Sequence, residues 1–204
     1  MSGFRFLRNA LLFSLVGLIP PLALYIAATP GLSAALSQGG PALLRFLRQV
    51  VTNGLPVVFV INYVSFFLYA LSNQAGQRRD PLAFVALDVF AKLSLFFSLH
   101  AIIYVLSSDW YGSFGGSRLT AVSVVAPTLS RSAFFENISG VYFYATLVGA
   151  IPLYVSVFKK SKATKMLIAR IPFDVGAITL AVASFASTAV LLTFLARLIV
   201  RIQG

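Results

Sequence analysis

Three ionisable side chains lie inside one long apolar segment of this chain. Between Leu82 and Leu106 the sequence carries Asp88, Lys92 and His100, which are surrounded mainly by Leu, Phe, Val and Ala. A charged side chain at the centre of a bilayer costs about 3 kcal/mol even on the gentler insertion scales, so such a residue needs a partner or a purpose. These three residues are therefore the first candidates for chemistry.

The spacing of the three residues allows two interpretations. Asp88 and Lys92 are four residues apart, so they share one helix face and can neutralise each other. His100 is rotated by about 120° from Asp88 around a helix. In one interpretation the three line a proton or ion path, with the carboxylate as relay and the imidazole titrating near neutral pH. In the other, which we prefer, the ion pair is structural and His100 bonds to a neighbouring helix.

Other chemistry has little support in the residue types. His100 is the sole histidine, so it is a weak candidate as a haem or pigment ligand, and a bis-histidine site within one chain is excluded. The chain has no cysteine, no recognisable nucleophile motif and no metal-ligand spacing. We therefore expect no catalytic residues, no metal, no bound cofactor and no enzymatic activity.

The composition requires a lipid environment. Hydrophobic residues make up 59% of the chain and charged residues only 10%, against roughly 25% charged in soluble domains. The net charge is +11, but the basic residues sit at the ends of apolar runs, where anionic headgroups account for them. The expected partners are the lipid bilayer and other membrane protein subunits, and no nucleic acid.

The hydrophobic pattern predicts an all-α integral membrane protein with a single transmembrane helical domain over residues 1–204. Helices of about 20 apolar residues are needed to cross a bilayer. The five predicted spans are about 10–28, 54–71, 82–106, 138–158 and 173–196. The segment 119–129 is too short to cross and is predicted to be surface-bound or re-entrant. Glu136 and Asp174 are predicted to cap the fourth and fifth spans.

A sixth helix is predicted at about 41–53. It places Leu44 and Leu47 on one side and Arg45 and Arg48 on the other, which is the pattern of a basic amphipathic helix. About 13 residues cannot cross a bilayer. We expect this helix to lie flat in the membrane interface, with packing against a partner subunit as the alternative.

Prolines interrupt the first and fourth spans. Pro20 and Pro21 lie in the first and Pro152 in the fourth, and each site is predicted to kink or break its helix. The six residues 15–20 (LVGLIP) and 147–152 (LVGAIP) differ at one position. Broken helices in inverted repeats are typical of secondary transporters. Short coincidences are common among apolar sequences, so chance is the preferred explanation.

The basic residues also predict an orientation. With five spans, nine basic residues fall on the N-terminal side and six on the other, which places the N-terminus in the cytoplasm. Arg5 and Arg8 precede the first apolar run as in a signal anchor. Arg197 and Arg201 then lie outside, against the rule. A bacterial inner membrane is the expected location.

These features favour a function without an active site. The expected role is an accessory or scaffold subunit of a larger membrane complex, because the chain has much apolar helix surface and short connections. The alternative is a small transporter or channel subunit, built on broken helices at Pro20/Pro21 and Pro152 with a polar path along Asp88, Lys92 and His100.

Overall fold

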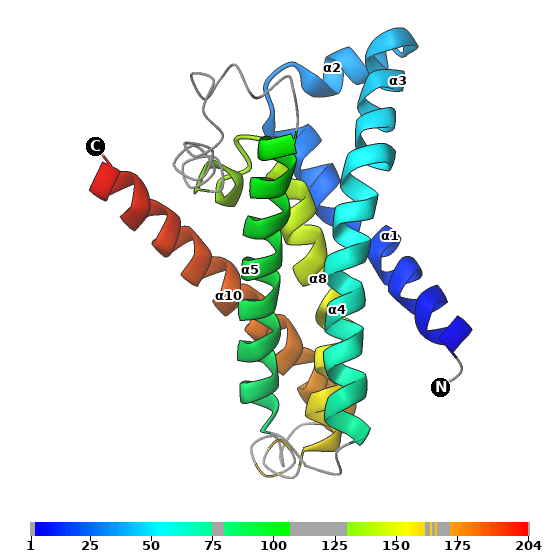
Figure 1. Cartoon of the computed structure of the whole chain (residues 1–204), viewed down its shortest axis with the longest axis vertical. Helices are drawn as coiled ribbons and strands as arrows, with labels where there is room; N and C mark the ends of the chain where they lie inside the picture. The colour runs from blue at the N-terminus through cyan, green and yellow to red at the C-terminus, as the bar shows by residue number, and fades with distance from the viewer. Residues whose placement is uncertain are drawn as a thin grey trace.

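A computed structural model describes residues 3–74, 80–106, 130–161, 164, 166 and 172–203 of the chain. All regular structure within these ranges is helical (Figure 1). In chain order the elements are α1 (Gly3–Ala28), α2 (Leu32–Ser37), α3 (Gly40–Gln49), the π-helical turn η1 (Val50–Gly54), α4 (Leu55–Gln74), α5 (Pro81–Leu106), α8 (Ile138–Lys160) and α10 (Phe173–Gln203). The predicted segment 119–129 lies outside the described residues.

Five of these helices are long and apolar enough to cross a membrane. They include residues 5–28, 40–71, 81–102, 138–160 and 174–198. The all-helical class and the presence of five helices of spanning length, both predicted from hydropathy, are confirmed. The observed helices α1 and α10 extend beyond the predicted spans, since they begin at Gly3 and end at Gln203 respectively.

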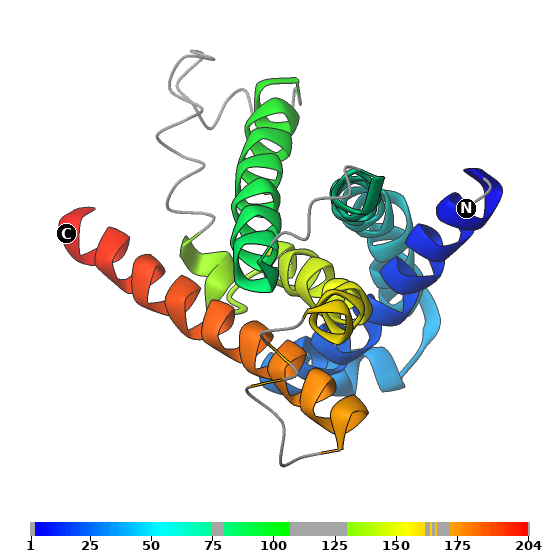
Figure 2. The same ribbon diagram turned by 90° about the horizontal axis from the view of Figure 1, so that it is seen from below.

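Helix α8 forms the centre of the bundle. In the most apolar stretch of α8, 67% of residues are buried, against 17% for α10. Helices α1, α4, α5 and α10 pack around it (Figures 1 and 2). Its aromatic and small side chains, such as Phe143, Tyr154 and Ala150, fill the core between these helices. An apolar sequence alone does not identify which of five similar helices is central.

Two glycines allow α1 and α8 to approach closely. A Cβ atom added to Gly17 would lie 2.7 Å from the carbonyl oxygen of Ala145 and 3.0 Å from Cα of Gly149. One added to Gly149 would lie 2.9 Å from the carbonyl oxygen of Phe13. Gly17 and Gly149 occupy the same position in the two similar six-residue segments, so the segments pack on each other where the helices cross.

Of the kinks or breaks predicted at the prolines, the breaks are wrong. Helix α1 continues through Pro20 and Pro21, and α8 continues through Pro152. Each proline lacks only its own backbone donor, and in membrane helices such a loss is tolerated when neighbouring groups compensate. The broken helices on which the transporter alternative partly rested are therefore absent.

The prediction of a separate helix at 41–53 is wrong, whereas the position of this segment in the membrane interface stays a prediction. Helix α3 runs through the π-helical turn η1 directly into α4, and Figure 1 shows the three in one line. Together residues 40–74 form a rod about 50 Å long at 1.5 Å per residue, more than the roughly 30 Å of a bilayer core. The amphipathic pattern thus belongs to the end of a long helix. The short helix that lies across this end of the bundle is α2.

The turn η1 is fixed by a tyrosine from α8. Tyr142 packs onto Gly54, where an added Cβ would lie 2.1 Å from the ring atom Cε1. The Tyr142 hydroxyl donates a hydrogen bond to the carbonyl oxygen of Gln49 at 3.4 Å, beside the turn. A π-helical turn displaces carbonyls from their usual α-helical partners. The contact with Tyr142 therefore supports the join between α3 and α4.

The helix ends show which residues act as caps. Asn137, rather than the predicted Glu136, caps α8, because its side chain accepts a hydrogen bond from the backbone N–H of Gly140 at 3.3 Å. Asp174 lies in the first turn of α10, where its charge suits the helix dipole, and its capping role stays a prediction. It also pairs with Lys159 at the end of α8, at 2.5 Å and largely exposed. This ion pair joins the facing ends of α8 and α10.

Candidate functional site: a buried ion pair between four helices

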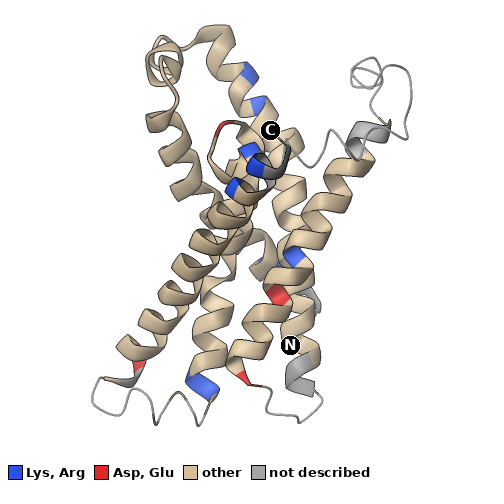
Figure 3. Cartoon of the chain, turned by 90° about the vertical axis from the view of Figure 1, so that its left-hand side faces the viewer, with Lys and Arg blue, Asp and Glu red and all other residues tan. Residues whose placement is uncertain are grey.

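An ion pair lies in the interior of the bundle. Lys92 Nζ contacts Asp88 Oδ2 across one turn of α5, and each side chain is only 1% exposed. Figure 3 shows this pair as adjacent red and blue segments within the bundle, while other charges lie near the helix ends. A buried ion pair loses hydration on both sides, so further hydrogen bonds are needed to compensate.

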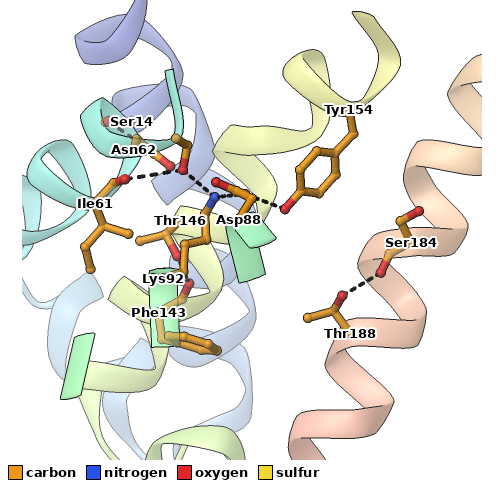
Figure 4. A network of polar contacts seen from close by, with 11 residues as sticks. Ser14, Ile61, Asn62, Asp88, Lys92, Phe143, Thr146, Tyr154, Ser184 and Thr188 are labelled. Carbon is orange, nitrogen blue, oxygen red and sulfur yellow. Dashed lines mark hydrogen bonds and ion pairs between the residues drawn. The ribbon is translucent and has the colours of Figure 1, made fainter. Parts of the chain in front are cut away.

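Two hydroxyl groups from other helices supply these bonds. The Tyr154 hydroxyl on α8 donates to Asp88 Oδ2 at 2.6 Å, and Lys92 Nζ donates to Ser65 Oγ on α4 at 2.6 Å (Figure 4). Lys92 Nζ also lies 5.9 Å from the centre of the Tyr154 ring. Ser65 in turn donates to the carbonyl oxygen of Ile61 at 3.3 Å. The pair therefore joins α4, α5 and α8.

A second polar contact lies beside the pair and reaches α1. Asn62 Nδ2 on α4 donates to Ser14 Oγ on α1 at 3.2 Å, and Ser14 donates to the carbonyl oxygen of Ala10 at 2.7 Å. Asn62 also touches the glycine crossing, because a Cβ on Gly149 would lie 2.6 Å from Asn62 Nδ2. Four of the five long helices thus contribute to one polar region, here called the polar core (Ser14, Asn62, Ser65, Asp88, Lys92 and Tyr154).

The polar core is incompletely satisfied. Among the described residues, two buried side-chain oxygens lack a hydrogen-bond partner, Asp88 Oδ1 and Asn62 Oδ1. A buried acceptor without a donor costs roughly 1 to 3 kcal/mol. The carboxylate thus has one oxygen with two donors and a second oxygen available for a proton or another donor.

His100 does not belong to the polar core. It lies eight residues beyond Lys92 on α5, about 12 Å along the helix axis. His100 Nδ1 is 2.8 Å from the carbonyl oxygen of Phe96, which can only accept, so Nδ1 carries the proton. The imidazole also packs on the Phe96 ring with a centroid distance of 4.1 Å. The structure therefore brings together two of the three residues in the predicted path and leaves the third apart.

The other candidate residues lie far from this region in the fold. Arg45 and Arg48 are exposed on α3, and Arg45 Nε donates to the carbonyl oxygen of Pro41 at 3.2 Å. Within the described residues, no group of three or more His, Asp or Glu side chains could hold a metal ion. His100 remains a single imidazole of the kind that ligates haem only with a second ligand from elsewhere.

Tyr154 and Ser65 are the residues that sequence reasoning missed. Hydroxyls are common in membrane helices, and neither residue stands out in its segment. One signal was available: a buried Asp–Lys pair needs donors and acceptors from neighbouring helices, which directs attention to Ser, Thr, Tyr and Asn in the other spans. Choosing among those residues requires the arrangement of the helices.

Comparisons with protein-family models, with curated proteins and with solved structures found no match to this chain.

The chemistry available to the polar core is limited and specific. Asp88 is able to gain a proton and Lys92 to lose one, and either change leaves a single uncompensated charge. With 1% exposure, neither side chain reaches solvent in this conformation. As described, the polar core fixes the relative positions of α1, α4, α5 and α8. A role in moving protons or ions requires a second conformation that opens it.

Proposed function

We propose that this protein is a non-enzymatic integral membrane protein that serves as an accessory or scaffold subunit of a larger membrane complex. The observation that carries the proposal is the unequal packing of α10. Figures 1 and 2 show α10 leaning away from the bundle towards its C-terminus. Val190 and Phe194 on this helix are 70% and 63% exposed. One face of this long apolar helix packs on its own chain, and the opposite face is exposed. The exposed face is suited to contact other subunits.

The closed polar core supports the same proposal. Its charges are neutralised within the chain, and no described residue presents them to a pore. Buried polar groups are retained in some proteins because they specify one packing arrangement among several apolar alternatives. In this protein such a core would hold α8 and its neighbours in register while the outer surface of α10 meets partners. The proposed setting is a bacterial inner membrane with the N-terminus in the cytoplasm.

Purification in a mild detergent tests the proposal. A scaffold subunit is expected to elute with other membrane proteins in a fixed ratio, as measured by native mass spectrometry. The double change Val190→Ala and Phe194→Ala should lower recovery of those partners. The matched control is Phe90→Ala on α5, which is 69% exposed. A protein that elutes alone as a defined homo-oligomer, with recovery equal for both variants, would contradict the proposal.

A second candidate is a small transporter or channel subunit. The observation that favours it is the contact between the two similar segments, whose glycines Gly17 and Gly149 meet beside Asn62 in the polar core. Inverted repeats that flank a polar site near the membrane centre are typical of transporters. Proteoliposomes should then show proton or ion flux that Asp88→Asn abolishes while the protein remains folded. Absence of flux across a range of ions and pH gradients would remove this candidate.

A further inference from the structure

An apolar pocket of about 540 Å³ lies between α5, α8 and α10. Its walls include Phe96 and Phe97 from α5, Phe143 from α8 and Leu192 and Leu195 from α10. Phe97 and Leu195 are 36% and 38% exposed, so the pocket is accessible from the outer surface of the helices. A volume of roughly 300 to 1,000 Å³ with mainly apolar walls is typical of sites for small apolar ligands.

Basic residues stand next to this pocket in the chain. Ser130 lines the pocket and is followed by Arg131, and Ala196 lines it and is followed by Arg197. Both arginines are exposed. Arg201, four residues after Arg197, lies on the same face of α10. Three arginines therefore lie at the end of the bundle where α10 terminates and α8 begins, which is a headgroup position for helices of this length.

Among the residues that the structure describes, Glu136 lies close to Arg131. Arg131 Nε lies 3.9 Å from Glu136 Oε2, and the two side chains are 69% and 57% exposed. Exposed pairs of this kind contribute little, and the wide separation leaves the guanidinium able to reorient. Among the described residues, Arg197 and Arg201 add two positive charges to the end of α10 beside the pocket.

We propose that the pocket binds one acyl chain of an anionic phospholipid, whose phosphate is held by Arg131 and Arg197. The apolar walls suit a hydrocarbon chain. The planar guanidinium groups suit a phosphate, which they bind through paired hydrogen bonds. The buried Ser130 and Ser132 hydroxyls lie in the pocket wall beside Arg131, where the chain would meet the glycerol ester groups. This inference concerns a lipid and does not depend on the proposed scaffold role.

Lipid titration followed by native mass spectrometry tests the headgroup contacts. Detergent-purified protein is mixed with phosphatidylglycerol or with phosphatidylcholine, and the bound fraction gives each dissociation constant. The anionic lipid is expected to bind tighter. The double change Arg131→Gln and Arg197→Gln should weaken binding of the anionic lipid by about 25-fold, since each basic residue near anionic headgroups contributes about five-fold. Arg5→Gln with Arg8→Gln, near the N-terminus, is the matched control and should change little.

A filled pocket tests the acyl-chain contacts. Ala196→Phe places a ring in the pocket and should abolish saturable binding, whereas Val190→Phe adds the same ring on the exposed surface of α10 and should not. If Ala196→Phe lowers the yield of folded protein, a tryptophan reporter replaces it. In a Trp110→Phe background, Phe97→Trp should be quenched saturably by phosphatidylglycerol with brominated chains, and Phe90→Trp on the outer side of α5 should not.

The contrary outcomes are distinct. Equal binding of the two lipids would show that the arginines do not select an anionic headgroup, and it would overturn the proposal. If the arginine variant loses binding while Ala196→Phe still binds, the headgroup is attracted without a site for the acyl chain, which would also overturn it. Binding of inorganic phosphate with the same affinity as the lipid would do the same. A dimer whose interface protects Phe97→Trp from quenching would show that a second copy of the chain occupies the pocket.

Discussion

Lys92 and Asp88 are each 1% exposed, so removing either partner leaves a charge with nowhere to be solvated. Breaking a buried pair from one side costs about 3 to 5 kcal/mol. We expect Asp88→Asn and Lys92→Met each to lower the thermal stability of the purified protein strongly. The double variant should be less destabilised than the sum of the two, with a coupling of about 1 kcal/mol or more, because both charges are then absent.

The exposed pair Lys159–Asp174 is the matched control for the buried pair. It joins two helices at the surface, with side chains 40% and 74% exposed. Such pairs contribute under about 1 kcal/mol, so Lys159→Met and Asp174→Asn should change the melting temperature little. Additive effects at Asp88 and Lys92, measured in the same thermal assay, would show that the two residues do not stabilise each other.

Sequence reasoning reached the ion pair but only part of its surroundings. The four-residue spacing of Asp88 and Lys92 predicts contact on any helix, because the period of the helix is fixed. The partners come from other helices. Ser65 precedes Lys92 by 27 residues in the sequence, and Tyr154 follows Asp88 by 66 residues. Contacts between helices depend on rotation and crossing angle, which five similar apolar segments do not specify. The role of His100 in a proton or ion path stays a prediction, and its distance of about 12 Å from Lys92 along α5 already follows from the sequence spacing.

At the scale of helices, the closest approach is the crossing of α1 and α8. Cβ atoms at Gly17 or Gly149 would meet backbone atoms at 2.7 to 3.0 Å, and backbone cannot move aside as a flexible side chain can. We therefore expect Gly17→Ala and Gly149→Ala each to destabilise the protein by about 1 to 3 kcal/mol, measured as a lower midpoint in detergent unfolding. Ala23→Val, which adds methyl groups on an exposed face of α1, should be nearly neutral. Equal effects at all three positions would refute the close crossing.

Helices α3 and α4 form one rod, and their length makes this testable. The chain has no cysteine, so spin labels can be placed at single introduced cysteines. Labels at Leu44→Cys and Leu71→Cys, which are exposed positions, are separated by 27 residues of helix, or about 40 Å between Cα atoms. A helix at 41–53 lying flat against an upright α4 would give about 30 Å. A distance distribution measured by pulsed electron resonance and centred near 30 Å would restore the interfacial helix.

The rod and the unbroken prolines show where local sequence patterns mislead. Arg45 and Arg48 gave residues 41–53 the amphipathic pattern of an interfacial helix, but the same pattern suits the part of a long helix that projects beyond the hydrocarbon. Proline removes a donor wherever it occurs, yet the surrounding helix decides whether the backbone deviates. In both places the course of the backbone depends on neighbouring helices. Tyr142 packs against Gly54 at the join of α3 and α4, and α8 packs against α1.

At the scale of the whole molecule, the bundle has two chemically different ends. Within the described residues, the end that includes the N-termini of α1 and α5 and the C-terminus of α8 carries Arg5, Arg8, Lys159 and Lys160. The opposite end carries only arginines among its basic residues, from α3, the segment before α8 and α10. The basic residues at 162, 165 and 170 also belong to the nine that predicted a cytoplasmic N-terminal side. They lie outside the described residues. Hydropathy could predict the number of long helices, because the length of an apolar segment is a local property of the sequence. The distribution of charge over the two ends also depends on the direction in which each helix runs.

The arrangement of the ends predicts a labelling pattern in the membrane. Helix α2 and the C-terminal end of α10 lie at one end of the bundle, and the C-terminal end of α8 lies at the other (Figure 1). With the N-terminus in the cytoplasm, Ser37→Cys should react with a membrane-impermeant maleimide in intact cells, and Lys160→Cys only after permeabilisation. Both positions are exposed, so access does not depend on local packing. If the two results are reversed, the fold is unchanged and the orientation in the membrane is the opposite one. If both cysteines are labelled from one side, the five long helices do not all cross the membrane.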